Sequence, residues 1–126
     1  MVPDSVPGPF ARFARRLSAC TSVLLALGVF IVGAQSEAAG LLQPHWGALV
    51  RLALFGGFAL ILHLGLQRRW LGSLISAALL GAADEIHQIW LPGRNASLAD
   101  WAVDIFGAAV CLVLVSLVAK RRSREP

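Results

Sequence analysis

The residues that could do chemistry gather in one short stretch of the sequence, between positions 84 and 104. Acids, an imidazole, an amide, a guanidinium and a hydroxyl occur there, at Asp84, Glu85, His87, Gln88, Arg94, Ser97, Asp100 and Asp104. Carboxylates accept protons, bind cations or pair with Arg, whose guanidinium forks onto carboxylate or phosphate oxygens. The stretch therefore predicts one of two things: an ion-pair lock between two segments, or a polar pocket that binds a ligand.

Helical spacing places these side chains on faces shared with small residues. Asp84, His87 and Gln88 follow the i, i+3, i+4 pattern of one helix face, and Asp100 and Asp104 follow i, i+4 on another. Small residues continue the two stripes, at Ser73, Ala77 and Gly81 on the first and at Gly107 and Ala108 on the second. Such stripes allow neighbouring helices to approach closely. We expect the two faces to pack together.

Asp100 and Asp104 carry like charges one turn apart, so they should repel unless a cation or a proton lies between them. Arg94 follows the Pro92-Gly93 turn, and we expect it to lie over these acids. Arg51 comes from another segment on the same side and could complete the cluster.

The rest of the chain is strongly apolar. Of its 126 residues, 57% are hydrophobic and 14% are charged, whereas soluble domains carry about 45–50% apolar and about 25% charged residues. A soluble chain of this length could not bury that much apolar surface, and disorder needs the opposite composition. The composition therefore predicts an integral membrane protein.

Four stretches are long and apolar enough to cross a bilayer as helices, at about 17–36, 47–66, 71–91 and 98–119. Short connections between them predict an all-α, up-down bundle of four transmembrane helices. We expect residues 1–16 to form a disordered basic tail, residues 17–119 the membrane domain, and residues 120–126 a second basic tail.

The distribution of Lys and Arg predicts the orientation. Nine of the eleven fall on one side of a four-span arrangement, at Arg12, Arg15, Arg16, Arg68, Arg69, Lys120, Arg121, Arg122 and Arg124. Cytoplasmic loops carry the excess of positive charge, so both termini should be cytoplasmic and the acidic cluster should face outward. The charge is thus a topology signal, and we expect no nucleic-acid partner. A cleaved signal peptide at the first apolar stretch is the alternative, and it would leave the termini on opposite sides.

The polar stretch resembles the VanZ-like family of small integral membrane proteins. The residues that carry the resemblance are Asp84-Glu85, His87-Gln88, Pro92-Gly93-Arg94, Ser97, Asp100, Asp104 and Gly107-Ala108. Asp104 is a departure, because many members have Asn there. The resemblance implies a multi-pass protein of the bacterial plasma membrane, and the founding member is linked to resistance to the glycopeptide teicoplanin.

Our leading interpretation is a cell-envelope protein that uses the cluster to engage a lipid head group, a cell-wall precursor or an antibiotic-related ligand. Three alternatives stay open: an intramembrane enzyme acting on a lipid-linked phosphate, with His87 or an acid as base and Arg94 on the phosphate; a small transporter or ion path; and a structural lock. No residue can be assigned as catalytic. One His and three acids are not a specific ligand set, so we predict no metal and no cofactor. The oligomeric state is not predicted.

Overall fold

The computed structural model describes residues 8–34, 44–65 and 69–123, and this part of the chain is helical, without a strand. Its helices are α1 (Pro9–Ala34), α3 (Pro44–Gly65), α4 (Trp70–Ile89) and α5 (Leu98–Arg122). The predicted all-α class is confirmed for the described residues.

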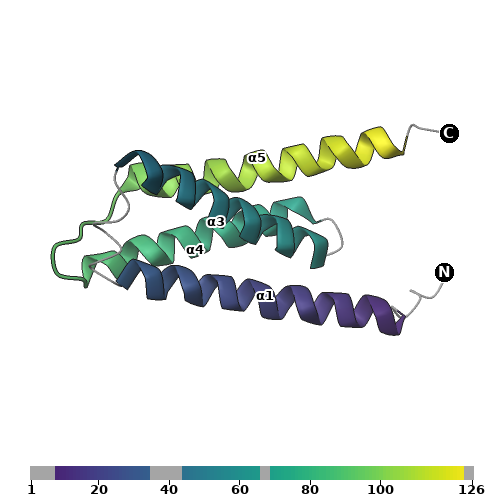
Figure 1. Ribbon diagram of the computed structural model, residues 1–126, viewed down its shortest axis with the longest axis horizontal. Coiled ribbons are helices and arrows are strands. Elements are labelled where there is room, and N and C mark those ends of the chain that lie inside the picture. The colour runs from purple at the N-terminus through teal and green to yellow at the C-terminus, as the bar shows by residue number, and fades with distance from the viewer. Residues whose placement is uncertain (1–7, 35–43, 66–68, 124–126) are drawn as a thin grey trace.

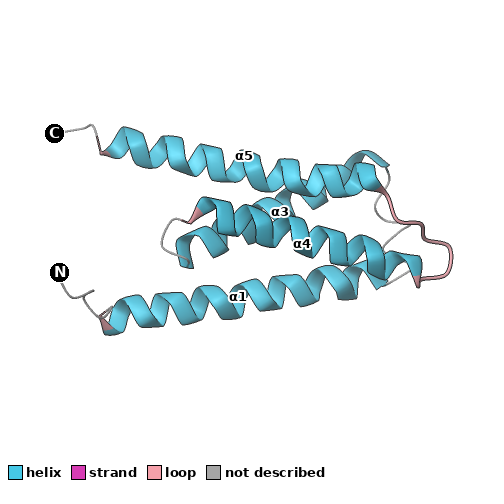
Figure 2. Cartoon of the chain, turned by 180° about the vertical axis from the view of Figure 1, so that it is seen from behind, coloured by secondary structure: helices cyan, strands magenta, loops and turns pink. Residues whose placement is uncertain are grey.

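The helices run alternately up and down (Figure 1). α3 and α4 contact each other and lie between α1 and α5, which do not contact one another (Figures 1 and 2). α1 begins and α5 ends at the same end of the bundle, while the α4–α5 connection lies at the other end. The sequence segments that carry the polar residues thus meet at one end of a narrow bundle.

Three of the helices are long and apolar enough to cross a membrane, with spans at Pro9–Ile31, Ala48–Gly65 and Leu98–Arg122. α4 is the exception among the described helices, although it has 20 residues. Its last two turns carry Asp84, Glu85, His87 and Gln88, which lower its hydropathy. The polar residues that α4 contributes to the cluster therefore keep it below the hydropathy of a membrane span.

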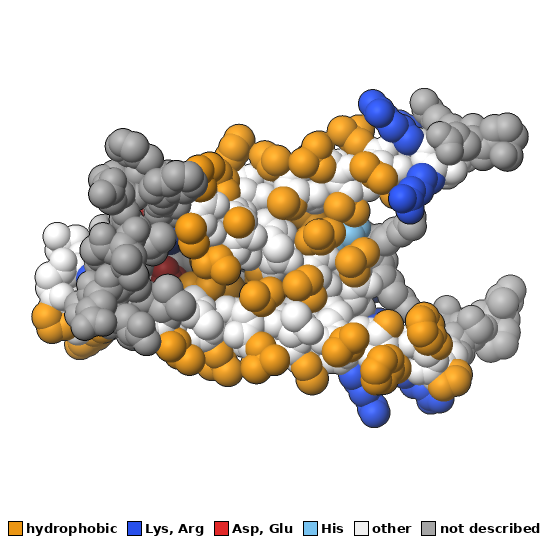
Figure 3. Space-filling model, in the orientation of Figure 1, with side chains coloured by type: hydrophobic (Ala, Val, Ile, Leu, Met, Phe, Trp, Pro, Cys, Tyr) orange, Lys and Arg blue, Asp and Glu red, His pale blue; other side chains and the backbone are white. Residues whose placement is uncertain are grey.

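The surface of the bundle is apolar along most of its length. Large hydrophobic side chains such as Leu24, Leu79 and Phe106 are exposed, and they cover the middle of the molecule in Figure 3. Lys and Arg side chains gather where α1 begins and α5 ends (Figure 3). An apolar belt next to a basic end is the surface expected of a bundle in lipid.

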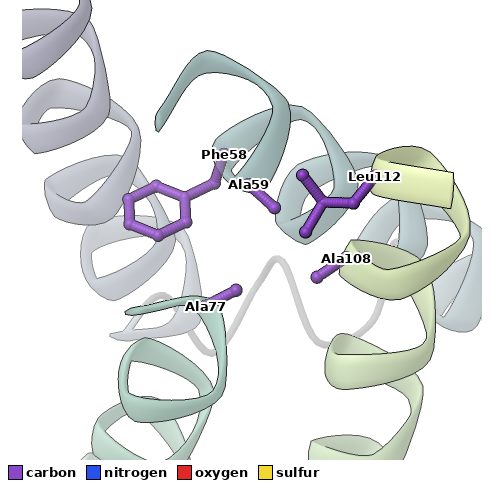
Figure 4. Close-up of a cluster of buried hydrophobic side chains, with 5 residues drawn as sticks. All are labelled: Phe58, Ala59, Ala77, Ala108 and Leu112. Atoms are coloured by element: carbon purple, nitrogen blue, oxygen red, sulfur yellow. The ribbon is translucent and has the colours of Figure 1, made fainter. Parts of the chain in front are cut away.

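Small residues hold the centre of the bundle together. Figure 4 shows Phe58 and Ala59 of α3, Ala77 of α4, and Ala108 and Leu112 of α5 packed around one point. All five are buried. Three of them are alanines. Because their side chains are small, the backbones of α3, α4 and α5 can approach one another closely.

The ends of two helices differ from the sequence expectation. α1 begins at Pro9, so residues 9–16, expected to be part of a disordered tail, are helical. Pro is well suited to the first helical position, and the amide of Arg12 donates to the carbonyl of Gly8. α5 likewise continues to Arg122, beyond the expected span. Hydropathy predicts only the apolar part of a helix, so it does not predict the polar turns by which α1 and α5 extend beyond it.

Candidate functional site

Arg51 of α3 lies at the centre of the polar cluster. Its Nε donates to Oδ1 of Asp104 at 2.8 Å, and its Nη2 donates to Oδ2 of Asp104 and to Oε1 of Glu85, each at 2.6 Å. Its Nη1 lies 3.4 Å from Oδ2 of Asp84. The guanidinium also lies 5.8 Å from the centre of the Phe55 ring. One side chain of α3 thus joins carboxylates from both α4 and α5.

The three carboxylates are unequally satisfied. Asp104 is fully buried and receives a bidentate pair from Arg51, whereas Asp84, 3% exposed, receives the longest of the Arg51 contacts. Nε2 of Gln88 donates to Oδ2 of Asp84 at 2.9 Å. Oδ1 of Asp84 is buried and has no hydrogen-bond partner within the described part of the chain. A buried acceptor without a partner costs about 1–3 kcal/mol, so this oxygen is the weak point of the network.

Glu85 connects the network to the start of α5. Its Oε2 accepts a hydrogen bond from the backbone amide of Ser97 at 2.7 Å. Ser97 is the residue that caps α5, because its Oγ accepts from the amide of Asp100 at 3.2 Å. The network therefore includes the N-terminus of α5 as well as the three ion pairs that Arg51 makes with Asp84, Glu85 and Asp104.

The Ser97 cap gives a first stability prediction. Replacing Ser97 with Ala removes the acceptor for the Asp100 amide, and we expect the free energy of unfolding to fall by about 1 kcal/mol. Ser97→Thr keeps a hydroxyl and should retain most of the stability. Unfolding of the purified variants in mixed micelles, followed by circular dichroism, measures both. Equal stability of Ser97→Ala and the parent chain would show that the cap is not used.

Trp101 joins α5 to α4 next to the network, although its position in the sequence did not indicate a site residue. Its indole Nε1 donates to the carbonyl of Ala78 at 2.8 Å. Gly81 makes room for this contact, because a Cβ there would lie 3.0 Å from Cδ1 of Trp101 and 2.9 Å from Oδ2 of Asp104. The small residue at position 81 is therefore required by both the indole and the buried acid.

We expect Trp101→Phe to lower the free energy of unfolding by about 1 kcal/mol, since the ring is kept and the hydrogen bond is lost. Trp90→Phe is the matched control, because Trp90 is 81% exposed at the end of α4. The same micelle unfolding assay compares the two. A loss that is equal for both substitutions would argue against the cross-helix bond.

Three predicted site residues lie outside the Arg51 network. We expected Arg94 to lie over Asp100 and Asp104. Within the described residues, however, Arg94 makes no ion pair of 4.0 Å or less with an acid. Arg51 pairs with Asp104 in its place. Asp100 lies in the first turn of α5, where its charge favours the helix N-terminus. The ring of His87 meets Phe30 of α1 edge-on, with ring centres 5.4 Å apart.

The predicted small-residue stripes are buried, but their partners differ from expectation. Ser73, Ala77 and Gly81 of α4 and Gly107 and Ala108 of α5 are all buried. Gly81 faces α5, as expected. Gly107 instead faces α3, where an added Cβ would lie 2.8 Å from the carbonyl oxygen of Leu52. This close approach of α3 and α5 brings Arg51 within reach of Asp104.

The charges of the network do not balance. One guanidinium faces three carboxyl groups, which leaves two formal negative charges in excess when all are ionised. Among the described residues, no group of three or more His, Cys, Asp or Glu side chains is arranged to hold a metal ion. The arrangement can compensate its excess charge by holding a proton or by accepting the cationic group of a ligand.

A pocket of about 260 Å³ lies beside the network, between α4 and α5. Its walls are mainly apolar, formed by residues such as Ile86, Leu98 and Trp101, and Glu85 and Ser97 also line it. The pocket therefore gives the network an apolar approach along the side of the bundle.

Together, the apolar belt, the membrane-length helices and the buried Arg–carboxylate network indicate a small helical membrane protein with a buried polar cluster. The family model VanZ/LLP1 matches residues 9–119. The chain therefore belongs to the VanZ/LLP1 family, as its polar stretch predicted. Comparisons with curated proteins and with solved structures found no match.

Proposed function

We propose that the chain crosses the bacterial plasma membrane four times, with both termini in the cytoplasm and the Arg51 network facing outward. The support is that α1 begins and α5 ends at one end of the bundle, where Arg and Lys gather, while the network lies toward the other end. α4 completes the bundle because its polar turns are covered by α3 and α5. A reporter inserted after Asn95 should appear outside the cytoplasm, and a cytoplasmic signal would overturn this orientation.

We further propose that the network binds a cationic group, such as an amine, on a lipid head group or a wall-related ligand. Through this ligand the chain would contribute to glycopeptide resistance of the teicoplanin type. The observation that carries the proposal is the partly satisfied carboxylate of Asp84, whose Oδ2 is bonded while its Oδ1 is buried without a partner among the described residues. An ammonium group donates several hydrogen bonds and would satisfy this oxygen and reduce the excess negative charge.

The pocket between α4 and α5 reaches the network at Glu85. The Asp84 side chain is 4% exposed, so a ligand that enters there reaches Asp84 only when neighbouring side chains move. The apolar pocket beside Glu85 would take the hydrocarbon part of an amphipathic ligand. A ligand approaching from the outer leaflet would therefore meet an apolar surface first and the acids second.

A structural lock is the second candidate, and the Asp104 pair favours it. Asp104 is fully buried and has both carboxylate oxygens bonded to Arg51, which suits a pair that fixes α3 against α5. Asp84 distinguishes the structural lock from the binding site. It contributes least to the lock, because its contact with Arg51 is the longest, and it contributes most to binding of a cation.

The test compares Asp84→Asn with Asp100→Asn, the same chemical change made outside the network. Each variant is scored for its folded level in the membrane and for teicoplanin susceptibility of the host. We expect Asp84→Asn to keep its level, because Arg51 retains Asp104 and Glu85, and to lose the phenotype. Asp100→Asn should keep both. A phenotype that survives in Asp84→Asn, or that falls only in step with the level, would overturn the binding site in favour of the lock.

A further inference from the structure

A second pocket lies at the opposite end of the bundle from the Arg51 network. It has a volume of about 630 Å³ and lies between the end of α3, the start of α4 and the end of α5. Among the described residues, His63, Lys120 and Arg122 line it, and no described acid does. The pocket is thus basic, whereas the network is acidic.

The polar groups of this pocket have unused bonding capacity. His63 is 5% exposed, and its Nδ1 is buried without a hydrogen-bond partner within the described chain. Lys120 and Arg122 are exposed and form no ion pair with a described acid. Two cations and an unpaired imidazole nitrogen around one hollow are suited to an anion such as a phosphate group.

An apolar groove continues from the basic pocket along α5. This groove, of about 350 Å³, is lined by Leu114, Val115, Val118, Ala119 and Arg122. Val115, Ala119 and Arg122 line both hollows, so the two are continuous. A basic pocket that opens into an aliphatic groove on a lipid-facing helix matches an anionic head group attached to an acyl chain.

We propose that this pocket binds an anionic phospholipid of the bilayer, with its phosphate on Lys120 and Arg122 beside His63. The acyl chain lies in the groove over Val115 and Val118. Trp70 lines the pocket from the start of α4, and Trp is a residue type that is enriched where membrane helices meet the head groups. The inference is independent of the Arg51 network, and it holds for either orientation of the protein in the membrane.

The experiment measures lipid retention by native mass spectrometry of the full-length protein, with added phosphatidylglycerol or phosphatidylcholine. Lys120→Gln/Arg122→Gln should weaken phosphatidylglycerol binding by about thirtyfold, which corresponds to about 1 kcal/mol for each cation near a membrane surface. The matched control is Arg12→Gln/Arg15→Gln, which removes two charges from the same end of the bundle but from α1, outside the pocket. We expect the control to bind as the parent chain does.

Further variants and lipids show whether the bound anion is the head group of a lipid or free phosphate. Ala119→Phe fills the junction of pocket and groove without changing charge, and it should weaken phosphatidylglycerol binding as well. Equal losses in the two charge variants would show diffuse attraction and overturn the proposal. Equal binding of phosphatidylcholine would also overturn it, as would displacement of the lipid by millimolar inorganic phosphate.

Discussion

Replacing Arg51 with Gln is expected to remove most of the folded protein from the membrane. The substitution leaves three carboxyl groups around a neutral side chain, and Asp104 keeps no partner for its buried charge. Removing one member of a buried ion pair costs about 3–5 kcal/mol. Membrane level measured by quantitative blotting, together with unfolding of the remaining protein in micelles, reports the effect.

Two further variants show whether the loss arises from the charge. Arg51→Lys keeps the charge but cannot reproduce the bidentate contact with Asp104, and we expect an intermediate level. Arg51→Gln combined with Asp104→Asn removes both members of the best pair and should recover part of the stability lost in Arg51→Gln. If the double variant is as unstable as the sum of the two single variants, the Arg51–Asp104 pair is not coupled and the network does not stabilise the bundle.

Replacing Gly107 with Ala is expected to have the second-largest effect. A Cβ at position 107 would lie 2.8 Å from the carbonyl oxygen and 2.9 Å from Cα of Leu52, so a backbone must move rather than a flexible side chain. Overpacking of this kind costs about 1–3 kcal/mol. Because Leu52 adjoins Arg51, the displacement should also weaken the Arg51–Asp104 pair.

Gly57→Ala is the matched control for this substitution. Gly57 lies on α3, and an added Cβ would meet nothing within 4 Å. Ala is favoured over Gly inside a helix by up to about 1 kcal/mol, so the control should be neutral or more stable. Unfolding curves of the two variants in the same micelles make the comparison. A Gly107→Ala protein as stable as Gly57→Ala would show that α3 and α5 are not in close contact there.

The acids and small-residue stripes of the cluster could be predicted from the sequence, because a charge or a glycine inside an apolar helix stands out. Asp84, Glu85 and Asp104 are buried at one end of the bundle, and Gly81 lies against the last of them. Helical periodicity shows which residues share a face. It does not show which helix covers that face.

The central position of Arg51 could not be predicted for this reason, although Arg51 was expected to complete the cluster. Arg94 lies between these acids in the sequence, within ten residues of each, whereas Arg51 lies more than thirty residues before them. Arg51 reaches Asp104 only because Gly107 admits α3 close to α5, and that contact depends on the tertiary packing of two distant segments. The sequence did carry one signal: Arg51 is the only Asp, Glu, Lys or Arg in α3, and a lone charge in an apolar helix needs a partner.

Binding of an amine by the Arg51 network can be measured directly. The purified full-length chain in phosphatidylcholine nanodiscs is titrated with phosphatidylethanolamine and, separately, with an amine-bearing wall precursor, for the parent chain, Asp84→Asn and Asp100→Asn. We predict that the parent chain and Asp100→Asn bind at least one probe, and that folded Asp84→Asn binds it about tenfold more weakly, as expected for the loss of a charge-assisted hydrogen bond. Failure of the parent chain to bind either probe, or equal binding by folded Asp84→Asn, would show that the Arg51 network is not a binding site for cationic groups.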